Sequence, residues 1–468
     1  MNAGWRAAGA ATIGALLLLS GCGRSSGGTT ATPTNQRQSS LADGDFGTLR
    51  SVCGKGDGHN IATGRGVTAT SINLGVVSDA GFVGAPGLDQ ELWDASDVFT
   101  KWCNSLGGIN GRKIIDTHLD SALTNYRQVV LEACQSDFAL VGGGGVFDDT
   151  GQADRLKCLL PAWPGFEVTP QARASDLQWQ ALPAPLNQLN NGLEKWLTQK
   201  FPDSKGAVGY LASNVAATIL TKRQDQEVFQ QLGWNPTSGG VDAEFNALGE
   251  TTWVPIATNL KQKGVKGLVW VGTPENLVAL EQAMQAINYK PEWIFGGING
   301  YDPALQKGFK TTPLPTYLPL EFAPFEYANQ HTLGGTAIHQ YLELFQKYLP
   351  KGKSHAALGI NSFASWLLFA QAAKACGANL TPKCMYGQMQ KTTKFNAGGL
   401  TGQSEIATQA PTQCFTATQA VLGGFKVVDV SPNTDVYNCS PSNIATLTGD
   451  YGKGTTLASV GKSVNDLK

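Results

Sequence analysis

The stretch Gly107-Gly108-Ile109-Asn110-Gly111-Arg112-Lys113-Ile114 separates two segments of different periodicity. Residues 90–104 before it carry apolar side chains at helical spacing, and residues 113–119 after it have the composition of a strand. Gly108 and Gly111 permit the positive φ angles at which a helix ends and the chain reverses into a strand. We therefore interpret the stretch as a structural turn rather than as a ligand site.

The same alternation of strands and helices continues on both sides of this turn. In a first series, strands are predicted at 72–77, 113–119, 138–141 and 161–163, and helices at 90–104, 125–135 and 149–159. In a second series, strands are predicted at 207–211, 267–271 and 293–295, and helices at 216–232, 251–263 and 274–287. Two long helices (334–348 and 359–376) and a β-hairpin turning at Gly423-Gly424 follow. This alternation favours two mostly parallel sheets, each covered by helices on both faces.

The N-terminus has the pattern of an export signal. Arg6 precedes a short apolar run at 13–19, which ends in Leu19-Ser20-Gly21-Cys22. The run is shorter than the roughly 20 apolar residues that a membrane span needs. Leu-Ser-Gly-Cys resembles the bacterial lipobox, in which the cysteine is lipidated. We expect residues 1–21 to be removed and Cys22 to anchor the chain at the outer face of the cytoplasmic membrane. An ordinary signal peptide with Cys22 near the cleavage site by coincidence is the alternative.

Composition sets the domain organisation. Residues 22–65 are rich in Gly, Ser, Thr, Gln and Asp, which predicts a flexible tether. The residues between 66 and 440 exceed what a single core usually supports, so two domains are expected. The Gly-, Ser- and Thr-rich tail at 441–468 is expected to be loosely held. The formal charge of the 468-residue chain is −1 and no basic stripe is present, so no nucleic-acid partner is expected.

Nine cysteines in an exported chain indicate disulfide bonds. No Cys-x-x-Cys pair and no Cys–His spacing typical of zinc occurs, so no metal site is expected. With Cys22 reserved for lipid, eight cysteines remain. Proximity in the sequence favours the pairs Cys376–Cys384 and Cys414–Cys439. Cys134 and Cys158 end consecutive predicted helices and form a third pair, which leaves Cys53 with Cys103.

The order of these motifs resembles that of type I periplasmic binding proteins. The turn at 107–114, the Gly-rich segment 141–145 and the strands at 208–211 and 268–272 carry the resemblance. The chain is most similar to the branched-chain amino acid (Leu/Ile/Val) receptors of ABC importers, over about residues 66–430. The resemblance implies an α/β fold of two Rossmann-like lobes, with parallel sheets flanked by helices and a three-segment hinge. It also implies a monomer that holds a small solute between the lobes by hinge closure and works with the transmembrane subunits of an ABC permease.

The resemblance also places the lobes. Lobe 1 is expected at 66–185 plus 323–408, and lobe 2 at 186–322 plus 409–440. Ligands of open parallel sheets bind beyond the carboxyl ends of the strands. That rule selects loop residues as ligand-binding candidates: Phe82, Phe147, Phe166, Glu167, Asn214, Thr273, Asn299 and Glu321.

Each class of candidate has a structural alternative. The phenylalanines, together with Phe322, predict an aromatic wall for a ring, a sugar face or an apolar side chain, with core packing as the alternative. The polar residues Asn214, Thr273 and Asn299 would orient polar groups, with turn formation as the alternative. We expect Asp148-Asp149 to cap a helix rather than to bind a ligand.

The usual amino acid site is not fully matched. Receptors of this family bind the α-carboxylate through hydroxyl and backbone N–H groups, and the ammonium through an acidic residue. This chain has Val146-Phe147 where Ser or Thr is expected, and Gly297-Ile298-Asn299 where a glutamate is expected. Because an unpaired buried ammonium costs several kcal/mol, the solute stays open, with Glu167 or Glu321 as the substitute acid.

Catalytic motifs do not support an enzyme. Gly142 to Gly145 lacks the Gly-Lys-Ser/Thr of a phosphate loop, the first strand lacks a G-x-G-x-x-G fingerprint, and no H-E-x-x-H occurs. We therefore predict no catalytic residue and no cofactor. Two other functions remain as alternatives. One is a sensor or signalling module of the same fold; the other is a secreted hydrolase with Glu167 and Glu321 as opposed carboxylates about 5 to 9 Å apart.

Overall fold

The computed structural model describes residues 40–234 and 241–468. Its first sheet has four parallel strands in the order β2-β1-β3-β4. These strands are β1 (Ser71–Ser78), β2 (Lys113–Asp120), β3 (Ala139–Val141) and β4 (Ala162–Trp163). Helices α1 (Gln90–Ser105), α2 (Tyr126–Ser136) and α3 (Asp149–Lys157) connect them. The parallel alternation predicted for this part of the chain is confirmed.

The second sheet runs β12-β11-β10-β9-β8-β6-β7, with β13 (Asn438–Cys439) beside β11. Its strands are β6 (Val208–Ser213), β7 (Asp242–Phe245), β8 (Gly267–Val271), β9 (Trp293–Phe295), β10 (Thr316–Leu320), β11 (Cys414–Val421) and β12 (Gly424–Val427). Its helices are α5 (Gly192–Lys200), α6 (Ala216–Gln231), α7 (Val254–Gln262), α8 (Pro274–Ala286) and α9 (Pro303–Gly308). Strands β6 to β10 are parallel, and the predicted hairpin is formed by the antiparallel pair β11 and β12.

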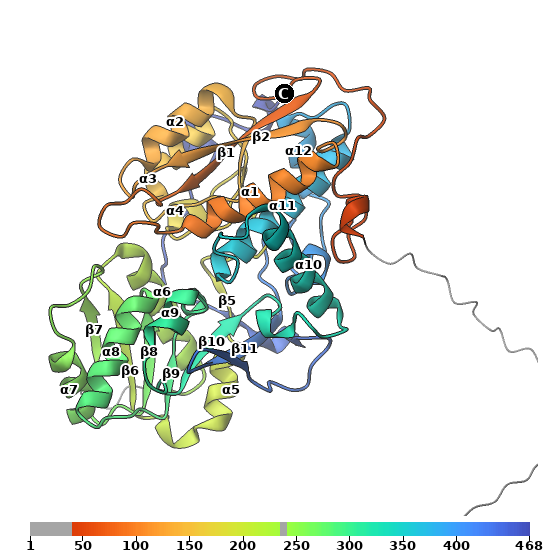
Figure 1. Ribbon diagram of the computed structural model, residues 1–468. Helices are drawn as coiled ribbons and strands as arrows, with labels where there is room; N and C mark the ends of the chain where they lie inside the picture. Colours follow the sequence, from red (N-terminus) through yellow and green to blue (C-terminus); the bar gives the residue numbers. More distant parts are fainter. Residues whose placement is uncertain (1–39, 235–240) are drawn as a thin grey trace, which may run out of the picture. The chain divides into compact units, whose positions relative to one another are not determined.

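Three later helices return to the first sheet. They are α10 (Leu333–Tyr348), α11 (Ala357–Cys376) and α12 (Pro382–Met389). Figure 1 shows α10 and α11 beside α1, and contacts join α11 to α1, β3 and β4. Helix α11 is buried on all sides, as expected for a helix that is apolar all round. The chain thus passes between the two sheets after β4, after β10 and before β11, which agrees with the expected three-segment connection.

The glycine turn at 107–111 has the expected conformation. Gly107, Gly108 and Gly111 have φ angles of 113°, 86° and 83°. A Cβ atom on Gly108 would lie 1.9 Å from the carbonyl oxygen of Arg112, so only glycine fits there. The Arg112 side chain is 1% exposed and donates to four carbonyl groups, those of Ile61, Thr68, Gly377 and Ala378. The turn is therefore structural, as predicted.

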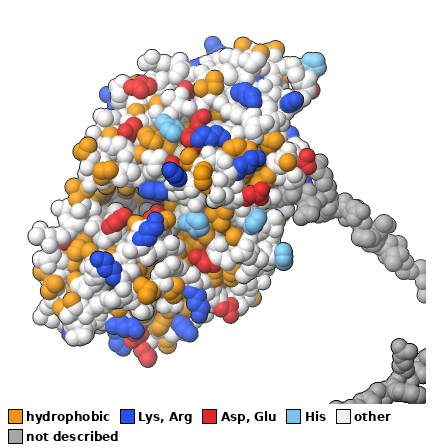
Figure 2. All heavy atoms as spheres, viewed as in Figure 1, with side chains coloured by type: hydrophobic (Ala, Val, Ile, Leu, Met, Phe, Trp, Pro, Cys, Tyr) orange, Lys and Arg blue, Asp and Glu red, His pale blue; other side chains and the backbone are white. Residues whose placement is uncertain are grey.

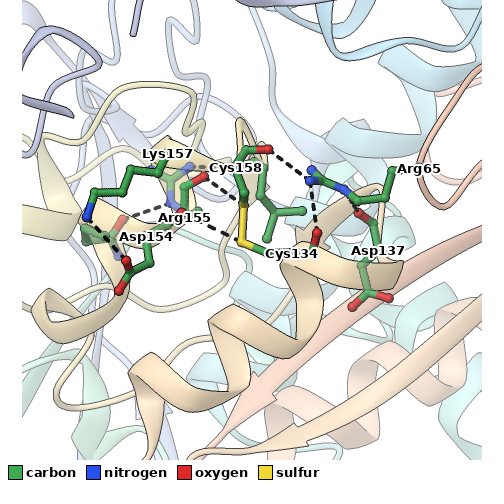
Figure 3. The surroundings of a disulfide bond; sticks show 9 residues. Arg65, Cys134, Asp137, Asp154, Arg155, Lys157 and Cys158 are labelled. Carbon is green, nitrogen blue, oxygen red and sulfur yellow. Dashed lines mark hydrogen bonds and ion pairs between the residues drawn. A yellow bond between two sulfur atoms is a disulfide. The ribbon is translucent and has the colours of Figure 1, made fainter. Parts of the chain in front are cut away.

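All four predicted disulfides are present: Cys53–Cys103, Cys134–Cys158, Cys376–Cys384 and Cys414–Cys439. Cys134–Cys158 joins the ends of α2 and α3 (Figure 3). Beside it, Arg65 donates to the carbonyls of Cys134 (3.2 Å), Asp137 (2.7 Å) and Cys158 (2.9 Å). The segment before β1 is thereby fixed to the same two helices.

Residues 40–65 do not behave as the flexible tether that composition predicted. Phe46 is fully buried, Gly47 N donates to Gln340 Oε1 (2.6 Å), and Trp102 Nε1 donates to the Leu41 carbonyl (3.0 Å). Backbone hydrogen bonds and the Cys53–Cys103 bridge supply the order that apolar periodicity does not. The signal segment 1–21, Cys22 and tether residues 23–39 lie outside the described residues.

The C-terminal tail is also held, contrary to expectation. Strand β14 (Ile444–Thr446) pairs antiparallel with β5 (Gln188–Asn190), in the connection between the two sheets. Leu447, Tyr451, Leu457 and Leu467 are all buried. The Lys468 carbonyl accepts a hydrogen bond from Lys383 N at the start of α12, and Figure 1 places the C-terminus on that side. The prediction of a loose tail was therefore wrong.

Charged side chains are dispersed over the surface. Figure 2 shows one face on which basic and acidic side chains are interspersed among uncharged ones. Positive and negative side chains are thus mixed on this face rather than gathered into separate patches. None of the helices in residues 40–234 and 241–468 has the length and apolar character that a membrane crossing requires.

Candidate functional site

Asp79 follows β1 and holds the loops after β2 and β3. Its fully buried carboxylate accepts hydrogen bonds from Leu123 N (2.7 Å), Val146 N (2.8 Å) and the Ser121 hydroxyl. Val146 precedes Phe147, so this contact fixes the backbone of the loop that carries one candidate residue. The carboxyl ends of β1, β2 and β3 are therefore joined through one aspartate.

Asp148 fastens the loop after β4 instead of capping a helix. It occupies the residue before α3, but its side chain makes no capping hydrogen bond. Its carboxylate accepts from Val168 N (2.9 Å), Thr169 N (3.1 Å) and the Thr169 hydroxyl. Burial raises the pKa of Asp148 to about 7, although these hydrogen bonds oppose the rise. The N-cap prediction was wrong because the loop at 168–169 competes for the same oxygens.

Glu167 lies in that fastened loop and has no hydrogen-bond partner among the described residues. Both of its carboxylate oxygens are buried from solvent. The loop backbone is held from the other side by Ser365 of α11, whose hydroxyl donates to the Pro164 carbonyl (2.7 Å). Burial, and next the charge of Asp148, raise the pKa of Glu167 well above its usual value. A buried polar group without a partner is costly and needs an explanation.

Two buried arginines influence Glu167 without contacting it. Arg155 donates to Gln152 Oε1, the Ser175 hydroxyl and three backbone carbonyls. Arg173, which ends α4 (Pro170–Arg173), donates to the carbonyls of residues 184 and 185 and to Gln224 Oε1 (2.9 Å). Burial lowers the pKa of each guanidinium to about 10. Their positive charges offset that of Glu167, while the hydrogen-bonding capacity of its oxygens remains unused.

The bond from Arg173 to Gln224 reaches helix α6 of the second sheet, where a further unpaired acid lies. Asp225 is 4% exposed, and its carboxylate takes part in none of the hydrogen bonds found among residues 40–234 and 241–468. Burial raises the pKa of Asp225 to about 8, against the effect of Arg173. Burial likewise raises the pKa of Glu321, after β10, to about 8, and that of Glu194 in α5 well above normal. The charges of Asp225 and Glu321 both act on Glu194, so these acids share one region.

The other polar candidates are less buried than these acids. Asn214 is exposed, and its Oδ1 accepts from Ala247 N (3.1 Å), which is the turn-forming alternative. Asn299 is exposed in a short 3₁₀ turn, Ile298–Gly300. Thr273 is half-buried before α8 and makes no capping bond. Their role in ligand binding stays a prediction.

The aromatic candidates divide into two kinds. Phe82, Phe147 and Phe166 are half-buried in loops at the carboxyl ends of β1, β3 and β4. Phe322 is fully buried and packs against Tyr301, with ring centroids 5.8 Å apart. Phe322 therefore belongs to the core, and its assignment to an aromatic wall was wrong.

Sequence reasoning did not select Arg155, Arg173, Glu194 or Asp225. Each lies within or at the end of a helix, where charged residues are usually solvated. The burial of Glu194 and Asp225 depends on tertiary packing, which helix periodicity in one sequence does not reveal.

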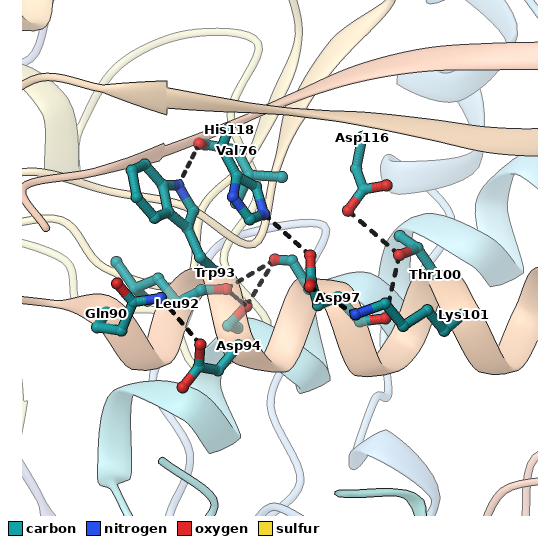
Figure 4. A network of polar contacts seen from close by, with 12 residues as sticks. Val76, Gln90, Leu92, Trp93, Asp94, Asp97, Thr100, Lys101, Asp116 and His118 are labelled. Carbon is teal, nitrogen blue, oxygen red and sulfur yellow. Dashed lines mark hydrogen bonds and ion pairs between the residues drawn. The ribbon is translucent and has the colours of Figure 1, made fainter. Parts of the chain in front are cut away.

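A second polar group lies at the edge of the first sheet. Asp97, Asp116 and His118 have side-chain atoms within 4.8 Å of one another. Figure 4 shows these groups already in contact with others: His118 Nε2 and Lys101 Nζ lie 3.0 and 2.7 Å from Asp97 oxygens. The Trp93 ring stacks on His118 with centroids 4.6 Å apart. The hydrogen bond to Asp97 raises the pKa of His118. This arrangement is a surface ion-pair network.

One family model matches a region that includes much of the second sheet. A family model described as "Periplasmic binding protein" matches residues 183–425. No curated protein matches the sequence. Because the family model covers more than half of the chain, the match is sufficient to assign the family.

Solved structures share the fold at low sequence identity. A fatty acid ABC transporter substrate-binding protein from Thermomonospora curvata is 16% identical, with a TM-score of 0.64, over 82% of this chain and 96% of that one. A branched-chain amino acid ABC transporter protein from Thermus thermophilus, with bound valine, is 14% identical, with a TM-score of 0.61, over 82% and 98%. A solute-binding protein from R. palustris in complex with 4-hydroxybenzoate is 12% identical, with a TM-score of 0.60, over 78% and 98%. The chain belongs to the periplasmic binding protein family and has its type I fold.

Proposed function

We propose that this chain is an extracytoplasmic solute-binding protein of an ABC importer, anchored to the membrane by lipid on Cys22. It binds a small solute between the carboxyl ends of its two sheets, and the hinge closes on the solute. The family match and the fold support this proposal. The lipobox-like sequence before Cys22 supports the anchor.

The unpartnered carboxylate of Glu167 is the observation that carries the proposal. It lies at the carboxyl end of a parallel strand, where open α/β sheets bind ligands. A solute that donates an N–H or O–H group would remove the cost of leaving Glu167 unpaired. We therefore expect the solute to complete a site that the protein leaves unfinished.

The charges of the region favour an amine as the donor. Glu167, Glu194, Asp225 and Glu321 are influenced by only two described cations, Arg155 and Arg173. Burial raises the pKa values of these carboxyls, so some remain protonated when no solute is bound. A protonated amine on the solute would favour their ionised form. The half-buried Phe147 and Phe166 would then contact the apolar part of the solute.

Thermal melting against a solute panel tests the proposal. The panel contains branched-chain and aromatic amino acids, diamines, aromatic carboxylic acids, sugars and fatty acids. A solute at 100 times its dissociation constant should stabilise the chain by about 2.7 kcal/mol, which is a visible shift in melting temperature. A shift only with solutes that lack an amine would refute the amine, and no shift with any class would count against solute binding.

The Glu167→Gln variant then tests the site. A hydrogen bond to a charged group contributes about 1.5–3 kcal/mol, so calorimetry should show affinity at least tenfold weaker. Asp149→Asn is the matched control, because it also replaces a carboxylate with an amide, and Asp149 is exposed at the start of α3. Equal affinity of wild type and Glu167→Gln would refute the role of Glu167. If the chain were a hydrolase instead, the same variant would abolish turnover of a glycoside.

A further inference from the structure

The C-terminal segment 447–457, here called the strap, runs from helix α6 to the first sheet. It leaves strand β14, which is paired with β5 between the sheets. Leu447 N donates to the Asn187 carbonyl (2.8 Å), and Leu447 and Tyr451 are buried against Leu220 and Val228 of α6. The strap is therefore a fourth connection between the sheets, besides the three covalent passages of the chain.

Glu227 anchors the strap on α6. Its carboxylate accepts from Thr448 N (2.6 Å), Thr448 Oγ1 (2.8 Å), Gly449 N (3.1 Å) and Tyr451 Oη (2.5 Å). Burial alone would raise the pKa of Glu227, but the bonds from Tyr451, Thr448 and Gly449 lower it to about 2. The Arg223 guanidinium lies 5.6 Å from the Tyr451 ring centroid. The carboxylate thus stays ionised, and the anchor stays intact, across the neutral range.

A second anchor lies on the first-sheet side. Thr455 N donates to the Gln171 carbonyl (3.1 Å), and the Thr455 carbonyl accepts from Asp176 N (3.0 Å). Leu457 N donates to Asp176 Oδ2 (2.7 Å). Residues 175–179 belong to the first sheet, because they bond to Arg155 of α3 and to Ala162 of β4. A Cβ on Gly454 would lie 1.6 Å from the Ala174 carbonyl oxygen, so the strap backbone passes directly against this side.

The length between the anchors limits how far they can separate. Only residues 452–454 lie between Tyr451 and Thr455. At 3.3–3.6 Å per residue, the four steps from residue 451 to residue 455 span at most about 14 Å. While both anchors hold, the Cα atoms of Tyr451 and Thr455 cannot lie further apart than this, so a larger separation must break one anchor.

We propose that the strap is a built-in restraint that limits how far the two lobes open. The inference rests on the hinge motion of the proposed function. A protein that visits its closed form more often binds its solute more tightly, because less free energy is used to reach that form. The strap would act in this way without touching the solute.

Lengthening the strap tests the restraint while leaving its anchors unchanged. Four residues, Gly-Ser-Gly-Ser, are inserted between Lys453 and Gly454, which adds up to about 14 Å of reach. The control carries the same insertion between Gly423 and Gly424, where an added Cβ would meet nothing within 4 Å. The radius of gyration of each solute-free full chain is measured by small-angle X-ray scattering.

The strap insertion should raise the radius of gyration, and the hairpin insertion should raise it less. Hydrogen exchange at the Thr448 and Gly449 amides shows whether the strap remains bound to α6. The radius of gyration should rise in either case, because a longer strap and a detached strap both release the restraint. Equal radii for the wild type and the strap insertion, or equal rises for both insertions, would overturn the proposal. Since no solute is used, a failure of the solute experiments would leave this result unaffected.

Discussion

Replacing Asp225 with asparagine should stabilise the chain at neutral and alkaline pH. Asp225 is 4% exposed on α6, and burial raises its pKa from 3.8 to about 8, with Arg173 opposing the rise. The unfolded chain loses this proton near pH 4, whereas the folded chain keeps it. The contribution of Asp225 to the stability of the wild type is therefore fully present below about pH 4. This contribution is lost as the pH rises to about 8.

The size of this loss follows from the interval between the pKa values of Asp225 in the unfolded and folded chain. Each pH unit between the unfolded and folded pKa values changes the free energy of unfolding by about 1.4 kcal/mol. Between pH 5 and pH 8 the wild type should lose about 4 kcal/mol through Asp225. The asparagine side chain does not titrate, so the variant lacks this loss. Its unpaired amide has a cost of its own, about 1–3 kcal/mol, but that cost is the same at both pH values.

Urea unfolding followed by tryptophan fluorescence, at pH 5 and at pH 8, measures this difference. The stability of Asp225→Asn relative to the wild type should rise by about 4 kcal/mol from pH 5 to pH 8. Asp203→Asn, an exposed substitution in the same lobe, is the control and should show little change. A difference between Asp225→Asn and wild type that is the same at both pH values would refute the argument that Asp225 is buried as an unpaired acid.

Three further predictions concern the turn, a disulfide and the anchor. Gly108→Ala places a Cβ 1.9 Å from the Arg112 carbonyl and should lower the melting temperature by several degrees; an unchanged melting curve would contradict the steric argument. Replacing Cys134 and Cys158 together by alanine should reduce the free energy of unfolding by about 2–4 kcal/mol in urea titrations, and equal midpoints would show that the bridge adds nothing. Cys22→Ala should move the exported chain from the membrane fraction to the soluble fraction on immunoblots, whereas retention in membranes would exclude lipid on Cys22 as the anchor.

Local sequence patterns were sufficient to predict many of the strands and helices, and the disulfides. Apolar runs such as 267–271 and amphipathic runs such as 90–104 carry their periodicity within a few residues, and the observed elements β8 and α1 nearly coincide with them. Cys134 and Cys158 end consecutive helices, so the order of elements brings them together. Strands β5, β7 and β10 and helices α5 and α12 were among the elements missed. Strands β5 and β7 each have only a few residues and are stabilised by their neighbours.

The order of residues 40–65 and of the C-terminal tail could not be predicted because specific hydrogen bonds hold these segments. Residues 40–65 and the strap are poor in apolar periodicity, and composition alone favours a free segment. Hydrogen bonds to side chains far away in the sequence give these segments their order. Gln340 accepts from Gly47 N, and Glu227 accepts from Thr448 N and Gly449 N. A single carboxylate far away in the sequence leaves no local pattern in the segment that it binds.

The candidate site shows why the missing acid of the second lobe need not exclude an amino solute. Where related receptors would carry a glutamate, this chain has Asn299, which is exposed. Glu167 lies instead after β4 of the first sheet, buried and unpaired. A buried ammonium without an acid and a buried acid without a donor are each unfavourable, but together they form a charge-assisted hydrogen bond. If the solute amine binds Glu167, the first sheet holds it before the hinge closes, and the second lobe needs to supply only the contacts of closure.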